Sequence, residues 1–168
     1  YDRPIVSTDV GQNQLWTTPF LELDGNHQLL TSGGLGTMGY GFPAALGAQM
    51  GNPEARVFAI CGDGGVQMNI QEFATAMHYH LPMTLIILNN GYLGNVRQWQ
   101  QLFYDKRYAG TKLLMDESAI VTRESIDNGE FEYVPNFVQL AQAYGAQGIR
   151  ITKVEELEDA FTKADNFK

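Results

Sequence analysis

The sequence predicts an α/β fold, a doubly wound and mostly parallel sheet with helices on both faces. Short apolar runs alternate with segments of helical length, which is the order that β-α-β units follow. The two clearest runs, residues 56–61 and 83–88, are continuously apolar, as expected of strands covered on both faces. Between them, residues 66–79 place apolar side chains at the spacing of one helix face. We therefore expect these two strands to be parallel neighbours.

The other elements follow from the same alternation. Strands are expected at residues 4–8, 28–31, 56–61, 83–88 and 148–151. Helices are expected at residues 12–23, 40–50, 66–79, 93–103, 136–144 and 154–165. Residues 104–134 form a long polar stretch without periodicity, so we predict a loop insertion there. The length fits a single domain over residues 1–168, with a proper core and no room for a second domain.

The composition is that of a soluble globular domain, with 44% hydrophobic and 18% charged residues. A net charge of −8 without a basic stripe argues against a nucleic-acid groove. The longest apolar run, residues 81–88, is too short to span a bilayer, so we expect no membrane partner and a cytoplasmic location. Cys61 is the one cysteine, which excludes an internal disulfide and suits a reducing compartment. Its place at the end of a strand predicts a small core side chain.

Two polar turns follow the two clearest strands. Gly62-Asp63-Gly64 comes after the first, and Asn89-Asn90 comes after the second. The carboxyl ends of parallel neighbours meet at one edge, where ligands of open α/β sheets bind. Magnesium takes one or two hard oxygens from protein and the rest from phosphates and water, and Asp63 and Asn90 can supply such oxygens. Gly64 and Gly65 let phosphates approach the backbone, and the following helix offers N–H groups. The pair therefore predicts a magnesium–diphosphate site.

Other readings of these glycines stay open at this point. Each turn alone is also a common structural turn, and only their joint placement favours a ligand. Residues 34–39 satisfy the dinucleotide pattern G-x-G-x-x-G, which would make the chain an NAD-binding Rossmann module. That fold needs an acidic residue about 20 positions later for the ribose. Asp63 lies near this spacing but between the glycines of a second anion-binding turn, so the NAD reading is the remote alternative.

The two turns at this spacing resemble the cofactor motif of the thiamine diphosphate enzymes. In that family the aspartate, the second asparagine and a backbone carbonyl two residues later bind the magnesium ion. The resemblance therefore implies that Asp63, Asn90 and the main-chain oxygen of Tyr92 are the metal ligands.

Residues 31–48, TSGGLGTMGYGFPAALGA, sharpen the resemblance to the catalytic subunit of acetolactate synthase, also called acetohydroxyacid synthase. In that family the residue matching Met38 is an apolar wedge that bends the cofactor, and its amide contacts the pyrimidine ring. The carbonyl matching Gly36 accepts a hydrogen bond from the 4′-amino group. The resemblance thus gives Met38 and Gly36 the catalytic roles.

Two further segments agree with this family. Residues 10–16 resemble a segment that holds the diphosphate, although the family often has histidine where this chain has Asn13. Residues 93–100 resemble the helix after the metal site, whose tryptophan lines the substrate channel; that residue is Trp99 here, while Asn95 stands where methionine is common. The implied cofactor-binding residues are Gly11, Gln12, Asn13, Gly36, Met38, Gly62, Asp63, Gly64, Gly65, Asn90, Tyr92, Leu93, Gly94 and Asn95.

For the intact protein the resemblance implies a thiamine diphosphate- and Mg²⁺-dependent carboligase of branched-chain amino acid synthesis. Its substrates would be the 2-oxo acids pyruvate and 2-oxobutyrate, and FAD would bind, if at all, in another domain. A homodimer or homotetramer formed through the cofactor site and a regulatory small subunit are the implied partners. The chain resembles a cofactor-binding domain cut from a longer polypeptide, so we do not expect it to turn over by itself. The alternatives are a related thiamine diphosphate-dependent 2-oxo acid decarboxylase or carboligase and a non-catalytic domain of the same fold.

Overall fold

The computed structural model describes residues 4–25, 28–113 and 135–167. It divides into two compact units, residues 1–112 and 113–168. The first unit holds the sheet and is the larger of the two. The expectation of a single domain over residues 1–168 stays a prediction.

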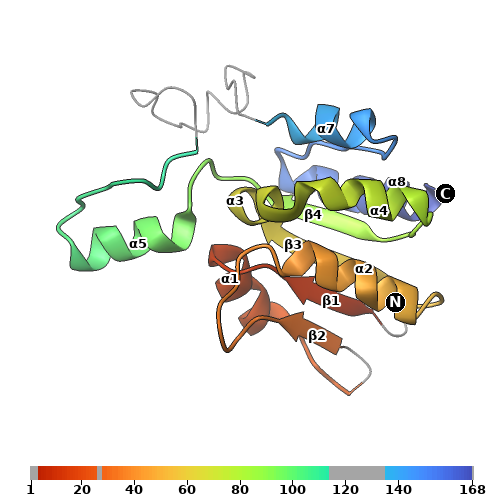
Figure 1. Ribbon diagram of the computed structural model, residues 1–168, viewed down its shortest axis with the longest axis horizontal. Coiled ribbons are helices and arrows are strands. Elements are labelled where there is room, and N and C mark those ends of the chain that lie inside the picture. The colour runs from red at the N-terminus through yellow and green to blue at the C-terminus, as the bar shows by residue number, and fades with distance from the viewer. Residues whose placement is uncertain (1–3, 26–27, 114–134, 168) are drawn as a thin grey trace. The chain divides into compact units, whose positions relative to one another are not determined.

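The sheet of the first unit has four parallel strands in the order β2-β1-β3-β4 (Figure 1). Their bounds are β1 (Ile5–Thr8), β2 (Gln28–Thr31), β3 (Val57–Gly62) and β4 (Thr84–Leu88). Thr8 of β1 pairs with Thr31 on one side and with Ile60 on the other, so β1 and β2 end level while β3 continues to Gly62. The predicted α/β class and the parallel pairing of β3 with β4 are confirmed.

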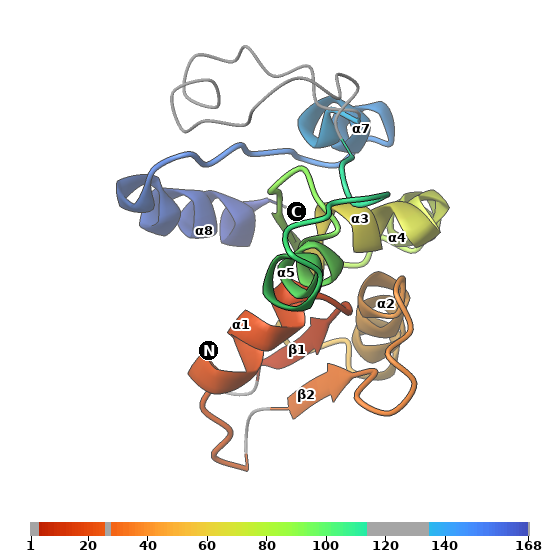
Figure 2. The same cartoon turned by 90° about the vertical axis from the view of Figure 1, so that its left-hand side faces the viewer.

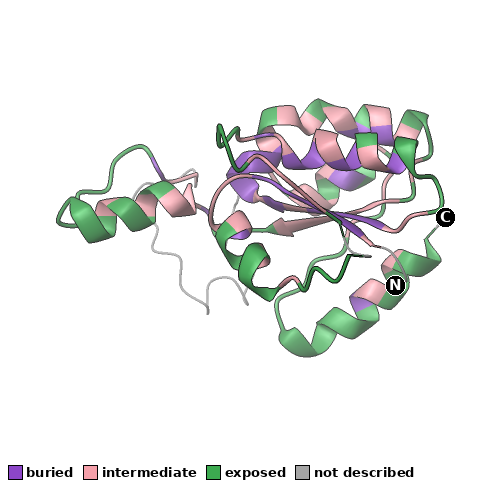
Figure 3. Ribbon diagram, turned by 90° about the horizontal axis from the view of Figure 1, so that it is seen from below, coloured by how far each residue is buried: buried purple, intermediate pink, exposed green. Residues whose placement is uncertain are grey.

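Helices cover both faces of this sheet. Figure 2 shows α1 (Gln12–Phe20) on one side of the strands and α2 (Gly41–Gly51) on the other. The central strands β1 and β3 are the most deeply buried, as the purple ribbons of Figure 3 show. Phe42 of α2 packs its ring 5.1 Å from that of Phe73, which joins the helices on this face. The core residues of these elements are Ile5, Val6, Phe42, Ala45, Leu46, Val57, Phe58, Ala59, Cys61 and Phe73.

The helix expected at residues 66–79 is interrupted. The chain forms α3 (Asp63–Val66), the 3₁₀ helix η1 (Gln67–Glu72) and α4 (Phe73–His78). The break lies at Asn69, whose φ of −134° and ψ of 39° are not helical. Its side chain donates a 2.7 Å hydrogen bond to the carbonyl of Gly39, so a long-range contact holds the kink that local periodicity does not predict.

Most other expectations about secondary structure are confirmed. α5 spans Gly94–Phe103, and the second unit contains α7 (Phe137–Ala143), η2 (Val154–Glu156) and α8 (Leu157–Asn166). The first helix ends at Phe20 rather than at residue 23, directly after Pro19, which cannot donate to the preceding turn.

The strand expected at residues 148–151 is wrong. These residues have no strand conformation, and two of them, Ile149 and Ile151, are exposed. Gly148 lies against Val138 of α7, where an added Cβ would be 2.9 Å from the Val138 Cα. The segment therefore packs on a helix, and apolar alternation alone did not give it a strand partner.

Part of the expected loop insertion is visible. Residues 104–113 return to the turn after β4, where Tyr92 and Lys112 form an antiparallel bridge. Residues 114–134 of the expected insertion lie outside the described residues. Within the ranges that the structure describes, no helix is long and apolar enough to cross a membrane.

Candidate functional site

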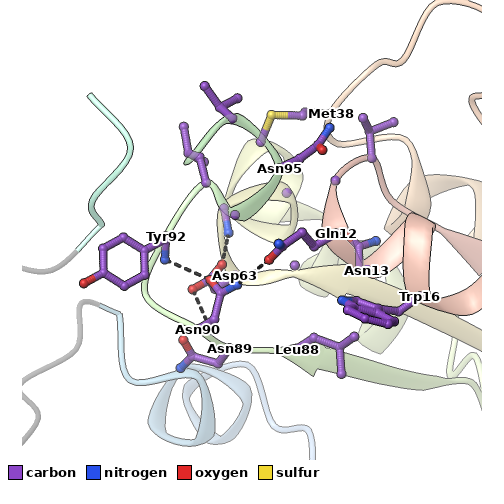
Figure 4. Close-up of a pocket in the computed structure, with 18 of the residues that line it drawn as sticks. Gln12, Asn13, Trp16, Met38, Asp63, Leu88, Asn89, Asn90, Tyr92 and Asn95 are labelled. Carbon is purple, nitrogen blue, oxygen red and sulfur yellow. Dashed lines mark hydrogen bonds between the residues drawn. The ribbon is translucent and has the colours of Figure 1, made fainter. Parts of the chain in front are cut away.

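A cavity of about 520 Å³ opens at the carboxyl ends of the strands in the first unit (Figure 4). The chain passes from β1 to β2 on one side and from β3 to β4 on the other, so the strand order reverses between β1 and β3. Open α/β sheets bind their ligands at such a reversal. The described lining residues are Val10, Gly11, Gln12, Asn13, Trp16, Gly36, Met38, Gly62, Asp63, Gly64, Gly65, Leu88, Asn89, Asn90, Tyr92, Leu93, Gly94, Asn95 and Val96.

Asp63 is the only charged residue among these lining residues, and its side chain is buried. One carboxylate oxygen accepts the N–H of Gly64 at 2.9 Å. The other accepts the N–H groups of Asn90 at 3.2 Å and Gly91 at 2.7 Å. The predicted contact between the two turns is therefore confirmed, because the Asp63 carboxylate accepts N–H groups from the turn after β3 and from the turn after β4.

Asn90 connects this turn to the first helix. Its Oδ1 accepts the N–H of Tyr92 at 2.9 Å, and its Nδ2 donates to Gln12 Oε1 at 3.3 Å. Gln12 donates in turn to Gln98 Oε1 of α5 at 3.1 Å. A carboxamide oxygen has two lone pairs, so Asn90 Oδ1 can keep the Tyr92 bond and also ligate a cation. The chain of amides sets Gln12 beside the predicted metal ligands.

The loop that contains the Tyr92 carbonyl is held by contacts with residues 104–112. The bridge to Lys112 is held by Leu93, whose N–H donates to the carbonyl of Thr111 at 2.7 Å. The Arg97 guanidinium lies 4.3 Å from the centroid of the Tyr92 ring and 3.7 Å from that of Tyr108. Cation–π contacts of this kind stabilise by about 0.5–1 kcal/mol each at exposed sites. They fasten residues 104–112 onto the turn that carries the predicted ligand.

Two glycines of the cavity lining have no room for a side chain. A Cβ on Gly65 would overlap Asp9 Oδ1, and one on Gly94 would overlap Gln12 Oε1 and come within 2.9 Å of Asn90 Nδ2. Gly65 packs against Asp9, and Gly94 packs against Gln12 and Asn90. Backbone N–H groups at such turns, together with the N-terminus of α5, suit an anion.

Met38 and Gly36 line the cavity from the segment between β2 and α2. In Figure 4, Met38 lies beside Asn95, away from Asp63 and Asn90. The segment is pinned at its start, where Ser32 accepts from Gly36 N–H through its carbonyl at 3.2 Å and from Thr37 N–H through its hydroxyl at 3.0 Å. Gly36 itself has a φ of 63°, a conformation that favours glycine.

Asp9, which was not among the predicted site residues, directly follows β1 and is fully buried. Its carboxylate accepts the N–H groups of Val10, Gly39 and Gly41 at distances of 2.9–3.1 Å. An acidic residue directly after a predicted strand was the available indication, since Asp63 has the same position after its strand.

The predicted residues differ in what their side chains do. All fourteen residues predicted to bind the cofactor line the cavity, which brings them together but does not test their roles. Asn13 uses its Nδ2 to bond the carbonyls of Asp9 at 2.8 Å and Ile60 at 3.0 Å, so it holds β1 against β3. Trp99 lies on α5 and is not among the lining residues; its side chain is half exposed. Trp16 lines the cavity instead, without having been singled out.

Two buried groups near the site have distinct electrostatics. Asn95 Oδ1 is buried without a hydrogen-bond partner among the described residues. Burial raises the pKa of the Cys61 thiol far above its usual range, and the negative charge of Asp9 adds to this rise. Cys61 therefore stays a neutral core side chain, as predicted, and takes no part in nucleophilic chemistry.

Known proteins resemble the chain over nearly its whole length. The family model described as "Thiamine pyrophosphate enzyme, C-terminal TPP binding domain" matches residues 9–168. The acetolactate synthase large subunit of Corynebacterium glutamicum is 45% identical over 160 residues, which are 95% of this chain and 23% of that protein. Acetolactate synthase isozyme 3 large subunit of Escherichia coli is 42% identical over 159 residues, 95% of this chain and 25% of that protein.

The chain thus spans about a quarter of the length of the curated relatives that it matches. The family match covers all four segments that line the cavity, from the turn after β1 to the turn after β4. The chain belongs to the thiamine pyrophosphate enzymes and carries their C-terminal TPP binding domain.

Proposed function

We propose that this domain holds thiamine diphosphate through a magnesium ion, and that the protein that carries it is an acetolactate synthase. The observation that carries the proposal is the joining of the turns after β3 and β4 through Asp63, with Asn90 and Tyr92 beside it. The same cavity contains Gly36 and Met38.

The donor set supports magnesium. Asp63, Asn90 and the carbonyl of Tyr92 would offer one carboxylate, one carboxamide and one backbone oxygen, which are hard ligands. In the described part of the chain no group of three His, Cys, Asp or Glu side chains could hold a metal. A site with a single carboxylate leaves the ion positive enough to attract a diphosphate, whose oxygens would complete the shell.

The turns support the diphosphate. Gly64 and Gly65 present backbone without side chains, and Gln12 lies at the start of α1 within bonding distance of Asn90. We propose that Gly11, Gln12 and Gly62 to Gly65 surround the diphosphate, with Leu93, Gly94 and Asn95 opposite. Asn13 would act by holding these turns in place.

The other end of the cavity would receive the ring system. Thiamine diphosphate supplies an electron sink for the carbon chemistry of 2-oxo acids, and the protein positions it. Met38 would support the rings as an apolar wedge, and the carbonyl of Gly36 would accept a hydrogen bond from the ring amino group. The buried Asn95 Oδ1 marks a polar position beside Met38.

The activity proposed for the whole protein follows from its relatives. Two of them, 45% and 40% identical over 95% and 97% of this chain, are named acetolactate synthase large subunit. We propose pyruvate as the donor, with pyruvate or 2-oxobutyrate as the acceptor, in branched-chain amino acid synthesis. A homodimer or homotetramer formed through the cofactor site, a regulatory small subunit and an FAD site in another domain belong to the same proposal.

The topology argues against the NAD alternative. The Gly34–Gly39 pattern follows β2, and Asp63 follows β3, but β1 lies between these two strands. Asp63 therefore does not stand at the neighbouring strand, where the ribose contact of a Rossmann module is made. Its carboxylate is also engaged with the N–H groups of its own turn and of the turn after β4.

The test is formation of 2-acetolactate from pyruvate by the full-length protein, stripped with a chelator and resupplied with each component. We expect product only with both thiamine diphosphate and Mg²⁺, and a loss of at least about 100-fold in Asp63→Asn, since a charged ligand is removed. Glu54→Gln, the same change at an exposed position, should keep the wild-type rate. Conversion of pyruvate to acetaldehyde without 2-acetolactate would overturn the carboligase, and product without added cofactor would overturn the cofactor site.

A further inference from the structure

We propose that Asp9 is a positioning residue: its buried carboxylate fixes the segment that carries Gly36 and Met38, and with it recognition of the ring end of the cofactor. This inference rests on the proposed function. It concerns a residue that does not line the cavity and would act only through the backbone that does.

Asp9 contacts three of the four segments that line the cavity or adjoin its lining residues. It accepts from Val10 in the turn after β1 at 2.9 Å, and from Gly39 and Gly41 in the segment before α2 at 2.9–3.1 Å. In the turn after β3, a Cβ on Gly65 would overlap Asp9 Oδ1. These three segments therefore meet on one fully buried side chain, while the turn after β4 donates to Asp63 instead.

The main chain of Asp9 leaves this side chain little freedom. Its N–H donates to the carbonyl of Ile60 at 2.9 Å, and its carbonyl accepts from Asn13 Nδ2 at 2.8 Å. Both groups tie Asp9 to β3 and to α1. The carboxylate is consequently a fixed point, and the glycine segment is the part that it can orient.

The contact to Gly39 sets one peptide plane of the cofactor segment. In a trans peptide the N–H and the preceding C=O point in opposite directions, so the Gly39 N–H aimed at Asp9 turns the carbonyl of Met38 away from it. Asn69 Nδ2 holds the carbonyl of Gly39 at 2.7 Å from the other side. Gly39 has a φ of 90°, and a Cβ there would lie 2.7 Å from both Asn69 Nδ2 and Met68 Cβ. The residue after Met38 thus has both its N–H and its carbonyl held by hydrogen bonds.

These contacts need an acceptor at both side-chain oxygens. Both oxygens of Asp9 accept N–H groups, and the Gly39 N–H is shared between them. An amide would place Nδ2 against Gly39 and Gly41 in one orientation, and against Val10 and Gly39 in the other. Asp9→Asn therefore sets a donor against at least two N–H groups whichever way it turns. The N-terminus of α2 begins at Gly41, which also favours a negative charge here.

The test compares two probes on the full-length protein by isothermal titration with Mg²⁺: inorganic pyrophosphate, which reports the diphosphate turns, and thiamine diphosphate, which reports these turns and the ring end. In Asp9→Asn we expect pyrophosphate affinity within about twofold of wild type and thiamine diphosphate affinity about tenfold weaker, a difference of about 1.4 kcal/mol. Glu54→Gln is the matched exposed control and should change neither.

Equal loss of both affinities would overturn the inference, because Asp9 would then only support the fold, and so would two unchanged affinities. If Asp9→Asn does not fold by circular dichroism, Asn69→Ala decides, since it frees Gly39 from the other side without adding a repulsive contact. The Asn69→Ala variant should bind thiamine diphosphate about threefold more weakly and pyrophosphate with unchanged affinity. If the two affinities do not differ in this way, the inference is overturned. A wild-type protein that binds pyrophosphate but gains nothing from the thiamine ring would overturn the proposed function as well.

Discussion

Replacing Gly94 by alanine should separate cofactor binding from stability. Gly94 is the first residue of α5, where alanine favours the helix by up to about 1 kcal/mol over glycine. The new Cβ would, however, overlap Gln12 Oε1 and approach Asn90 Nδ2 to 2.9 Å. Both atoms are ends of flexible side chains, so they can swing away and relieve the overlap at little cost to the fold.

The expected loss is in binding, because the 3.3 Å hydrogen bond between Asn90 and Gln12 breaks when these side chains part. A hydrogen bond contributes about 0.5–1.5 kcal/mol, which corresponds to about 2- to 10-fold in affinity. We therefore expect thiamine diphosphate with Mg²⁺ to bind about 2- to 10-fold more weakly to Gly94→Ala. The free energy of unfolding should stay within about 1 kcal/mol of wild type or rise.

Gly47→Ala provides the same substitution in a control position. Gly47 lies in the exposed part of α2, and an added Cβ there meets nothing within 4 Å. This variant should gain up to about 1 kcal/mol in urea unfolding and bind cofactor as the wild type does. Isothermal titration and urea unfolding on the three proteins make the comparison. Unchanged affinity in Gly94→Ala would refute the role given to the Gln12–Asn90 contact, and a large loss of stability would refute the relief of the overlap.

Three more predictions concern single residues. Arg97→Met removes the contacts to Tyr92 and Tyr108, so it should raise the Mg²⁺ concentration for half-saturation by about 2- to 5-fold at a fixed cofactor concentration. The control Arg107→Met should leave this concentration unchanged. Equal Mg²⁺ midpoints for the two variants would contradict a role of Arg97 in holding Tyr92. Gln49→Leu should lower the free energy of unfolding by about 1–3 kcal/mol, because buried Gln49 donates to the carbonyls of Asn52, Pro53 and Ala55. The cofactor affinity of the folded variant should not change. An unchanged free energy of unfolding in urea would contradict this prediction. The pKa of Cys61 is raised in the folded state. The contribution of the thiol to the free energy of unfolding is therefore complete below its unfolded pKa of about 8.5. Above that pH only the unfolded thiol ionises, so this contribution becomes smaller as the pH rises. The unfolding free energy should therefore fall less steeply above pH 9 in Cys61→Ala than in wild type, and parallel curves would argue against a protected thiol.

The sheet and the meeting of the two turns could be predicted because they depend on local patterns. Continuous apolar runs mark strands buried on both faces, and polar residues directly after them must meet where parallel strands end. Asp63 and Asn90 follow from this rule alone. The rule also applies to Asp9, which directly follows β1, but no glycine motif drew attention to it.

The features that sequence reasoning missed are held by contacts between distant residues. The kink at Asn69 depends on the carbonyl of Gly39, which no helical periodicity in residues 66–79 can reveal. Asn13 has a polar side chain that could bind a ligand, yet its Nδ2 donates to the backbone carbonyls of Asp9 and Ile60. The expected strand at 148–151 failed for the converse reason, since alternation was present but Gly148 packs on α7.

The central claim is that a magnesium ion on Asp63 and Asn90 holds a diphosphate at the end of β3 and β4. The most direct measurement is isothermal titration of thiamine diphosphate into the full-length protein, with Mg²⁺ and with a chelator, beside the variant Asp63→Ala. Binding heat that appears only with Mg²⁺ and disappears in the variant is the predicted result. Heat that is the same with chelator, or binding of NAD in place of thiamine diphosphate, would contradict it.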